Sequence, residues 1–152
     1  MKIAIGNDHR GLSLKKKILQ KFSHLRNVAF MNVGSDSEER VDYPDYAKQV
    51  AQKVSQGECE RGILICGSGV GMSIVANKFP HVRASLVWDS KVAALTRQHN
   101  DSNILCLSGD LMDEKKAFDI VRTWLETSFE GGRHETRIKK IQAIERELKE
   151  KK

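Results

Sequence analysis

One stretch of the chain joins an ionisable thiol to a run of bare backbone. The apolar segment 61–66 ends at Cys66, and glycines follow at positions 67, 69 and 71 before a helical pattern resumes. This order predicts a buried strand, a glycine loop and a helix start. Unpaired amides there favour anions and developing negative charge, so a thiol beside them could serve as a thiolate base or nucleophile. The alternative is that Cys66 merely ends a core strand, because free cysteine is among the most buried residue types.

Two histidines and two arginines are the other candidates for chemistry. His9 follows Asp8 in a polar turn, whereas His99 falls on the inward stripe of a predicted helix, near its end. His99 is either a core histidine or a general acid/base. Arg133 and Arg137 stand four residues apart in the first turns of a helix, where two cations repel each other and oppose the helix dipole. A phosphate clamp or a solvated helix face would each explain the pair.

Common nucleotide and metal motifs do not fit these residues. Position 72 is methionine, so the glycine loop is not G-x-G-x-x-G, and no G-K-[ST] follows it. The five histidines show no ligand-type spacing such as H-x-x-x-H. The residues therefore predict neither a metal site nor a nucleotide cofactor.

Composition narrows the class of protein. The 152 residues carry a formal net charge of +6, and the segment after residue 132 holds eight basic and four acidic residues. A solvated helix face explains this tail better than nucleic-acid binding, because few aromatics interleave with the charges. Three cysteines without a C-x-x-C pair, and neither a signal peptide nor a long apolar span, predict a reduced cytoplasmic location away from membranes. We expect one domain over residues 1–152.

Strand and helix patterns alternate along the chain. Continuous or alternating apolar runs predict strands at residues 2–6, 28–33, 61–66, 82–87 and 104–107. Helical spacing recurs over residues 14–25, 44–54, 71–79, 92–99, 117–125 and 138–148. Such alternation predicts an α/β fold with a five-stranded parallel sheet covered by helices on both faces.

The strand order decides which loops meet. In the order 2-1-3-4-5, the chain reverses between strands one and three, and folds of this kind bind ligands at that switch point. The loop after strand one carries Asp8 and His9, and the loop after strand three carries Cys66 to Gly71. Because the two loops richest in chemistry would converge there, this order favours a functional role for Cys66.

Six strings of residues, which span nearly the whole chain, resemble one known family: residues 6–11, 42–44, 65–71, 76–79, 97–101 and 130–137. That family is ribose-5-phosphate isomerase B, which also includes galactose-6-phosphate and allose-6-phosphate isomerases. The resemblance implies a three-layer Rossmann-like sandwich and metal-free aldose–ketose isomerisation without a cofactor. It also implies a homodimer or homotetramer with shared active sites, in which the helix at about 133–150 packs on a partner subunit.

The resemblance also implies roles for individual residues. Cys66 would move the proton between C2 and C1 of the sugar. His99 would open the furanose ring, with Asp8 assisting proton transfer at the oxygens. The implied substrate-binding residues are Gly67, Ser68, Gly69, Val70, Gly71 and Asn100 for the enediolate, and His9, Arg133 and Arg137 for the phosphate, the arginines coming from the neighbouring subunit.

One position departs from the family pattern. Where many relatives carry an arginine after strand five, this chain has Asp110. A carboxylate facing a phosphate would weaken binding unless a nearby cation offset it. We predict that Arg10, beside His9, supplies that charge, and that Asp110 pairs with an arginine or a sugar hydroxyl. The alternative is that Arg10 is a solvated loop residue.

These observations lead to one preferred function and two alternatives. We expect interconversion of ribose 5-phosphate and ribulose 5-phosphate through an enediolate, a step of the pentose phosphate pathway. Isomerisation of a hexose 6-phosphate such as allose or galactose 6-phosphate would use the same site residues. A non-catalytic sugar-phosphate binding module would keep the fold but leave the C2 proton of the sugar in place.

Overall fold

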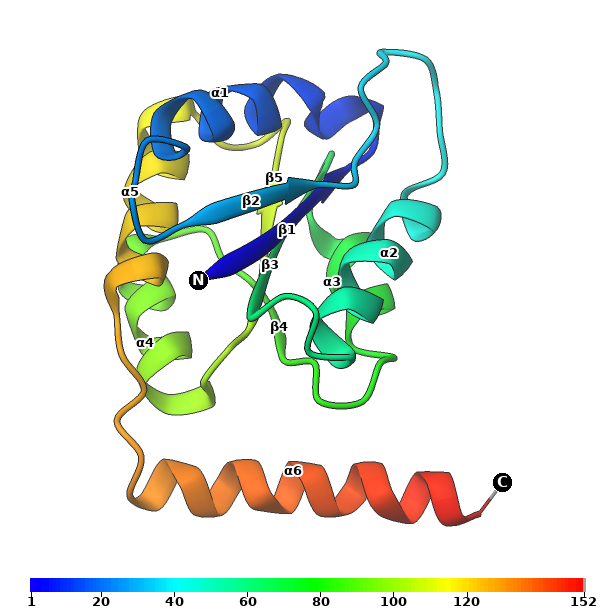
Figure 1. Cartoon of the computed structure of the whole chain (residues 1–152), viewed down its shortest axis with the longest axis vertical. Helices are drawn as coiled ribbons and strands as arrows, with labels where there is room; N and C mark the ends of the chain where they lie inside the picture. Colours follow the sequence, from blue (N-terminus) through cyan, green and yellow to red (C-terminus); the bar gives the residue numbers. More distant parts are fainter. Residues whose placement is uncertain (152) are drawn as a thin grey trace.

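The computed structural model describes residues 1–151 and contains a five-stranded parallel sheet (Figure 1). The strands are β1 (Lys2–Asn7), β2 (Ala29–Asn32), β3 (Arg61–Cys66), β4 (Ala84–Leu86) and β5 (Ile104–Ser108). The helices are η1 (His9–Gly11), α1 (Leu12–Phe22), α2 (Tyr43–Ser55), α3 (Val70–Ala76), α4 (Ser90–Asn100), α5 (Glu114–Glu126) and α6 (Arg133–Glu150). The predicted α/β class is confirmed, and every strand pair is parallel.

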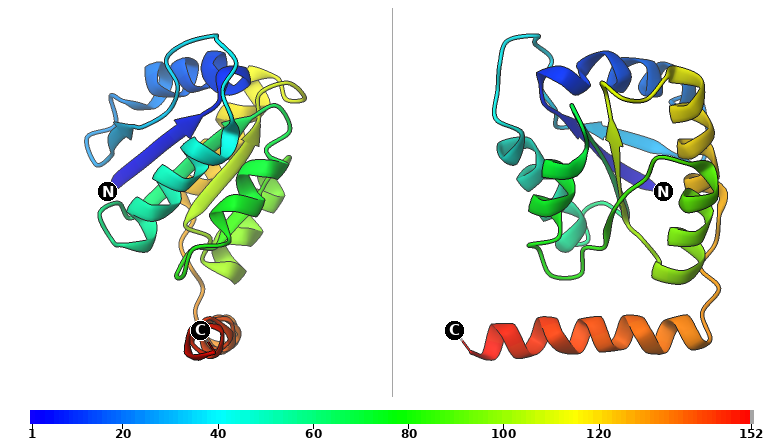
Figure 2. Two further views of the ribbon diagram at one scale, coloured as in Figure 1. Left: turned by 90° about the vertical axis from the view of Figure 1, so that its right-hand side faces the viewer. Right: turned by 180° about the vertical axis from the view of Figure 1, so that it is seen from behind.

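Helices cover both faces of the sheet (Figure 2). Successive side chains of a strand point to opposite faces, so each strand contributes to two cores. Ile63 and Ile65 of β3 pack with α1, α4 and α5, whereas Leu64 and Cys66 pack with α2 and α3. Cys66 therefore belongs to the α2–α3 layer of the three-layer sandwich.

The predicted strand order is wrong at its last two positions. The observed order is β2-β1-β3-β5-β4, because β5 pairs with both β3 and β4. All residues of β5 are buried, while those of β4 are half-buried. The continuous apolar run Ile104–Leu107 suits a central strand covered on both faces, and the polar Arg83 and Ser85 suit an edge. The exchange leaves the switch point between β1 and β3 in place.

The two ends of the sheet carry different parts of the chain. We call the end where β1, β3 and β5 finish the carboxyl edge, and the end where they begin the amino edge. Asn7, Cys66 and Ser108 mark the carboxyl edge. A helix that links parallel strands runs back against them, so α4 ends at the amino edge, next to the start of β5.

Helix α6 extends beyond the amino edge, apart from both helical layers (Figures 1 and 2). It buries His134 and Ile138 against the rest of the chain, while Ile141, Ile144 and Leu148 stay exposed. The apolar stripe of α6 is thus largely uncovered by its own chain. Within residues 1–151, no helix combines the length and apolar character that crossing a bilayer requires.

Candidate active site

Cys66 lies where β3 meets the glycine loop. Its side chain is buried, and the amide of Gly69 donates a hydrogen bond to Sγ over 3.2 Å. Gly69 has a φ of 79°, and a Cβ at this position would lie 2.9 Å from the carbonyl oxygen of Leu107. Only glycine lets the loop turn back toward the sulfur in this way. The thiol is both part of the core and in contact with the loop amides, so the two interpretations of Cys66 are compatible.

The loop after β1 lies beside the glycine loop, as the switch-point argument predicted, because β1 pairs with β3. The Asp8 carboxylate accepts hydrogen bonds from the amides of Arg10 at 2.9 Å and Gly11 at 3.2 Å, and it thereby caps η1. His9 Nδ1 accepts from the amide of Val41 at 3.3 Å. The neutral His9 ring therefore carries its proton on Nε2, which is left free to donate.

Arg10 and Asp110 form an ion pair across the start of the glycine loop. The distance from Arg10 Nε to Asp110 Oδ2 is 2.6 Å, and the two side chains are 58% and 34% exposed. A Cβ on Gly67 would lie 2.8 Å from Asp110 Oδ2, so the bare backbone of Gly67 leaves room for the pair. The expectation that Asp110 pairs with an arginine is confirmed, and the arginine is Arg10. That Arg10 also offsets a phosphate charge stays a prediction.

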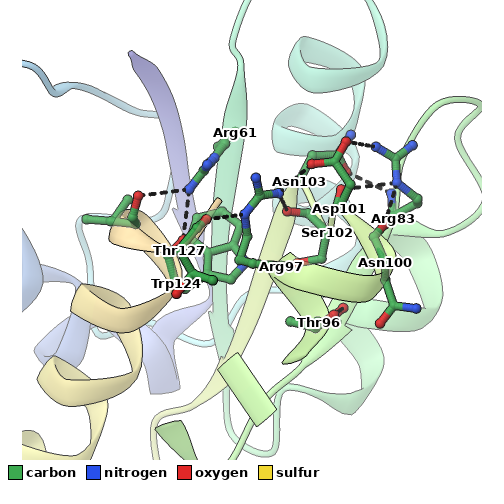
Figure 3. A network of polar contacts seen from close by, with 12 residues as sticks. Arg61, Arg83, Thr96, Arg97, Asn100, Asp101, Ser102, Asn103, Trp124 and Thr127 are labelled. Carbon is green, nitrogen blue, oxygen red and sulfur yellow. Dashed lines mark hydrogen bonds and ion pairs between the residues drawn. The ribbon is translucent and has the colours of Figure 1, made fainter. Parts of the chain in front are cut away.

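A network of ion pairs holds the last turn of α4, which ends at Asn100 (Figure 3). His99 belongs to the same turn. Asp101 follows α4 with a φ of 46°. Its carboxylate pairs with Arg97 at 2.8 Å and with Arg83 at 3.1 Å. The Nε of Arg83 also donates to the carbonyl oxygen of Asn100 at 2.9 Å. Asp101 thus links the end of α4 to Arg97 within the helix and to Arg83 next to β4.

Arg61 extends the same network toward α5 (Figure 3). It donates to the carbonyl oxygen of Trp124 at 2.8 Å, and its guanidinium lies 5.0 Å from the centre of the Trp124 ring. Burial, and next the charge of Arg97, lower the pKa of Arg61 to about 10. The side chain still carries its charge at neutral pH. Arg97 in turn donates to the carbonyl oxygen of Thr127 at 3.3 Å, so the network anchors the segment that leads into α6.

His99 meets α6 through a second histidine. The rings of His99 and His134 are stacked, with centroids 4.2 Å apart and planes 13° apart. Arg137 Nη1 lies 3.5 Å from His134 Nδ1, and Glu130 Oε2 lies 3.5 Å from His134 Nε2. Arg133 and Arg137 are exposed at the start of α6. The two predicted phosphate-binding arginines therefore sit on the same side of the molecule as His99.

The predicted site residues fall into two groups at opposite edges of the sheet. Ile104, at the start of β5, pairs with Gly62, four residues before Cys66. Four residues of a strand span about 13 Å, and α4, whose last turn contains His99, ends beyond the start of β5 (Figure 1). The structure brings together Asp8, His9, Arg10 and the glycine loop. It does not bring His99, Asn100, Arg133 or Arg137 to Cys66 within one chain.

One group of side chains in the described part of the chain has ligand atoms close enough to hold a metal ion. His99, Glu130 and His134 offer atoms that all lie within 4.8 Å of one another. The two rings lie in nearly parallel planes with centroids 4.2 Å apart, so their in-plane lone pairs do not meet at one ion. Arg133 and Arg137 are close enough to His134 to lower its pKa, and they would repel a cation. These three side chains are therefore poorly arranged to hold a metal ion.

Several residues of the site region escaped the sequence argument. His134 lies within residues 130–137, one of the segments that resemble the family, but nothing in the sequence marks it as buried against His99. Asp101 follows a helix end, where a left-handed residue is common, and that position could have identified it as a cap. Tyr43 packs its ring on the glycine loop: a Cβ on Gly71 would lie 2.6 Å from Tyr43 Cζ. Pairing distances of this kind depend on tertiary contacts that spacing does not encode.

A cavity of about 580 Å³ lies away from these residues. It is found between the ends of α1 and α5, with Phe22, Leu25 and Leu125 among its lining side chains. It contains no group of the candidate site. Concavity alone is therefore a poor guide to the chemistry of this chain, and we place the candidate site by its residues.

Comparisons with known proteins agree with the resemblance. Residues 3–141 match a family model described as Ribose/Galactose Isomerase. The chain is 48% identical over 146 residues to ribose-5-phosphate isomerase B of Escherichia coli, a match that covers 95% of this chain and 96% of that protein. It is 46% identical over 146 residues to a putative sugar phosphate isomerase of Bacillus subtilis, covering 95% and 97% of the two chains.

Solved structures resemble the fold closely. Ribose-5-phosphate isomerase B of Clostridium thermocellum superposes with a TM-score of 0.93 at 47% identity, covering 97% of this chain and 99% of that one. The enzyme of Mycoplasma genitalium, solved with bound ribulose-5-phosphate, has a TM-score of 0.92 at 42% identity, covering 96% and 97%. Both similarities extend over nearly the entire chain.

Proposed function

The chain belongs to the ribose/galactose isomerase family, and we propose that it interconverts ribose 5-phosphate and ribulose 5-phosphate without a metal. Escherichia coli ribose-5-phosphate isomerase B is nearly half identical to it, and a Mycoplasma genitalium relative was solved with ribulose-5-phosphate bound. The observation that carries the proposal is Cys66 Sγ accepting the Gly69 amide at the mouth of the glycine loop.

Cys66 is the proton carrier in this proposal. With the sugar in its open-chain aldehyde form, the thiolate takes the C2 proton, and the electron pair left behind forms a C1–C2 double bond while O1 becomes negative. The thiol then returns the proton to C1, and O2 loses its proton to O1 as the C2 carbonyl forms. No electrons leave the substrate, so the reaction needs no redox partner.

The glycine loop stabilises the enediolate. Proton removal beside a carbonyl needs donors aimed at the oxygen where charge develops. The Ser68 amide donates to no other group in the described chain, and the Ser68 hydroxyl is exposed, accepting the Val70 amide at 3.2 Å. These groups stand within a few residues of the base. The loop thus offers a base and an oxyanion partner in one turn.

A second copy of the chain completes the site. His99 and Asn100, with Arg133 and Arg137, occupy the edge opposite Cys66, so a single chain leaves the base and the ring-opening group apart. A symmetric dimer brings the amino edge of one subunit to the carboxyl edge of the other and builds two equivalent sites. This arrangement accounts for both halves of the predicted residue set.

The exposed apolar side chains support such an assembly. The side chains of Ile144 and Leu148 on α6 are 55% and 61% exposed. Ile74 on α3 is 55% exposed, and Trp88, which follows β4, is 61% exposed. Large apolar side chains gathered on a few elements are typical of protein interfaces. Sedimentation of the purified protein measures the assembly directly, and a monomer that retains full activity would contradict a shared site.

The phosphate of the sugar is bound by hydrogen-bond donors from both subunits. His9, with Nε2 free, and the guanidinium of Arg10 lie at the carboxyl edge. Arg133 and Arg137 approach from the partner, where their position on the first turns of α6 aims both at one anion. Charge-assisted bonds of this type each contribute about 1.5–3 kcal/mol.

Solvent deuterium exchange tests the proposal. Protein treated with EDTA is incubated in D₂O with ribose 5-phosphate, and the C2 proton and the ketose product are followed by NMR. We expect both exchange and ribulose 5-phosphate. Binding without exchange would identify a sugar-phosphate binding module instead, and it would overturn the proposed catalysis.

Hexose 6-phosphates are the second candidate substrates, because the family description covers galactose as well as ribose isomerases. The same base and phosphate ligands would serve, and the length of the pocket would decide between the sugars. Competition of ribose 5-phosphate with allose 6-phosphate and galactose 6-phosphate in one assay ranks them by kcat/KM. A higher kcat/KM for a hexose would reassign the substrate while leaving the chemistry unchanged.

We place the protein in the cytoplasm. Cys59, Cys66 and Cys106 are all unpaired. A thiol base must stay reduced to act, and reducing compartments keep thiols in that state.

A further inference from the structure

His134 is a buried polar residue in an otherwise solvated helix. It is 3% exposed, and the other buried side chain of α6 is Ile138. Its Nε2 atom is buried without a hydrogen-bond partner in the described chain. Burying an unpaired polar atom costs free energy, so an apolar residue at this position would pack α6 against the chain at a lower cost in folding free energy. The presence of a histidine here calls for a role beyond packing.

The surroundings of His134 define its protonation and tautomer. Arg137 presents only donors, so His134 Nδ1, 3.5 Å from Arg137 Nη1, is the accepting nitrogen and the proton sits on Nε2. Nε2 faces Glu130 Oε2 at 3.5 Å, beyond a full hydrogen bond. Burial first, then the charges of His99, Arg133 and Arg137, lower the pKa of His134, against the opposing effect of Glu130. The ring is thus neutral at pH 7.

The neutral ring defines the plane of His99. The torsion that turns an imidazole about its Cβ–Cγ bond is broad, so the ring plane needs an external contact to be fixed. Within residues 1–151, neither nitrogen of His99 forms a hydrogen bond with another residue, and His134 covers one of its faces with the planes 13° apart. The stack thus holds the plane of the His99 ring within 13° of the plane of His134.

We propose that His134 is a positioning residue for ring opening, holding His99 in the orientation that reaches the furanose of a substrate bound at another subunit. The proposal rests on the proposed function. Ring opening breaks the C1–O4 bond: the electron pair and a proton go to O4, and O1 loses its proton as the C1 carbonyl forms. A histidine that exchanges protons with both oxygens must face them edge-on, and the stack covers a face of the His99 ring rather than an edge.

The experiment separates ring opening from proton transfer by the choice of substrate. Ribose 5-phosphate is mostly a furanose, whereas ribulose 5-phosphate stays open-chain because its C5 oxygen carries the phosphate. Isomerisation of ribose 5-phosphate therefore needs His99. Exchange of the C1 proton of ribulose 5-phosphate with D₂O needs Cys66 and the glycine loop. The two rates are measured on the same enzyme preparations.

Three variants make the comparison. In His134→Leu we expect kcat for ribose 5-phosphate to fall about 10- to 100-fold, the scale of a misplaced catalytic group, while exchange from ribulose 5-phosphate changes less than about twofold. His134→Phe keeps a flat ring on His99 and should recover most of the loss. Ile138→Val alters the next buried contact of α6 without touching His99 and should leave both rates within about twofold. His134→Gln replaces His134→Leu should the latter not fold.

Two results would overturn the proposal. One is a non-aromatic variant at position 134 that isomerises ribose 5-phosphate at the wild-type rate. The other is equal loss of isomerisation and exchange, or a phenylalanine variant as impaired as the leucine one, because either outcome means that the site as a whole is disturbed. A wild-type chain that neither isomerises nor exchanges would overturn the proposed function as well. This failure is seen with the wild-type protein alone, whereas a failure of the proposal for His134 is seen only when the variants are compared with it.

Discussion

The carboxyl and amino edges of the sheet position their functional groups by different means. At the carboxyl edge, strand pairing and glycines that tolerate close contact hold Cys66 and its loop, and Gly69 and Gly67 have no room for a side chain. At the amino edge, ion pairs around Asp101 and one stacked pair of rings hold His99 and Asn100. The first arrangement depends on backbone geometry and the second on individual side chains.

This difference has a consequence for mutations. A substitution at the carboxyl edge either removes the base or distorts the backbone, so its effects are large. At the amino edge each contact is one of several, so single substitutions weaken the arrangement in steps. Effects should therefore rank from the thiol, through the glycine loop and the Asp101 network, to the exposed pair and the titration of His134.

Removing the thiol should have the largest effect. Cys66→Ala deletes the proton carrier, and we expect kcat to fall about 10³-fold, the range of a lost general base. Inhibition by inorganic phosphate should hardly change, because the base acts mainly in the transition state. Steady-state kinetics with ribose 5-phosphate measures both. Normal turnover by Cys66→Ala would place the base elsewhere.

Alkylation provides a control for the same residue. Burial raises the pKa of the Cys59 and Cys106 thiols, so both stay protonated and unreactive at neutral pH. Iodoacetate should therefore label Cys66 first, and labelling should track loss of activity. Cys59→Ala serves as the matched variant and should keep both the labelling and the rate. Prior labelling of Cys59 in the wild-type protein would contradict the assignment.

The glycine loop should respond next most strongly. Gly69→Ala forces a side chain into a φ of 79° and to within 2.9 Å of a backbone oxygen, so we expect a loss of about 3 kcal/mol in the free energy of unfolding. Gly57 has a φ of 76° with nothing within 4 Å, so Gly57→Ala isolates the backbone strain at about 1–2 kcal/mol. Urea unfolding measures both. Equal losses would show that the loop is not tightly packed.

The Asp101 network should show an intermediate effect. Asp101→Ala leaves the buried Arg97 without its carboxylate, and because Asp101 is 35% exposed we expect a cost of about 2 kcal/mol rather than the full value for a buried pair. Turnover should fall as the turn carrying His99 loosens. Asp119→Ala removes an equally short but exposed pair with Lys115 and should cost under about 0.5 kcal/mol. Calorimetric unfolding that does not separate the two variants would contradict a structural role for the network.

The same contrast between the edges explains what the sequence could predict. Periodicity and the glycine spacing predicted the α/β class, the helix that carries residues 138–148 and the meeting of the loops after β1 and β3, because local patterns encode these features. The order of β4 and β5 was wrong because both runs are apolar, and only burial on both faces separates them. The separation of His99 from Cys66 and the His134 stack depend on which chain segments pack together. Neither is visible in spacing.

The exposed pair of Arg10 and Asp110 sharpens the contrast at the carboxyl edge itself. If Arg10 faces the phosphate, Arg10→Ala should raise KM for ribose 5-phosphate about tenfold and weaken inhibition by inorganic phosphate equally. Asp110→Asn should strengthen that inhibition about two- to threefold, because it frees the Arg10 charge from an exposed pair. Arg26→Ala, at an exposed position near the amino edge, is the matched loss of charge. Unchanged phosphate inhibition in Arg10→Ala would show that Arg10 only faces water.

The smallest expected effect comes from the titration of His134, where α6 packs against the end of α4. Burial lowers the pKa of His134 from its ordinary value of 6.5, with His99 on α4 and Arg133 and Arg137 on α6 adding to the shift and Glu130 opposing it. The unfolded chain then takes up a proton near pH 6.5 that the folded chain refuses until lower pH. Stability from this group is complete above pH 6.5 and declines as pH falls below it.

Unfolding curves of the wild type and His134→Phe between pH 7.5 and pH 5 isolate this contribution, since the other histidines titrate in both proteins. As the pH falls over this range, the free energy of unfolding should decrease more in the wild type than in the variant, and above about pH 7.5 the two pH profiles should be parallel. Profiles that stay parallel down to pH 5 would mean that His134 accepts its proton as readily in the folded chain as in the unfolded one. The contact between α4 and α6 would then be open to water, and the side-chain arrangement at the amino edge would be looser than the stacked rings imply.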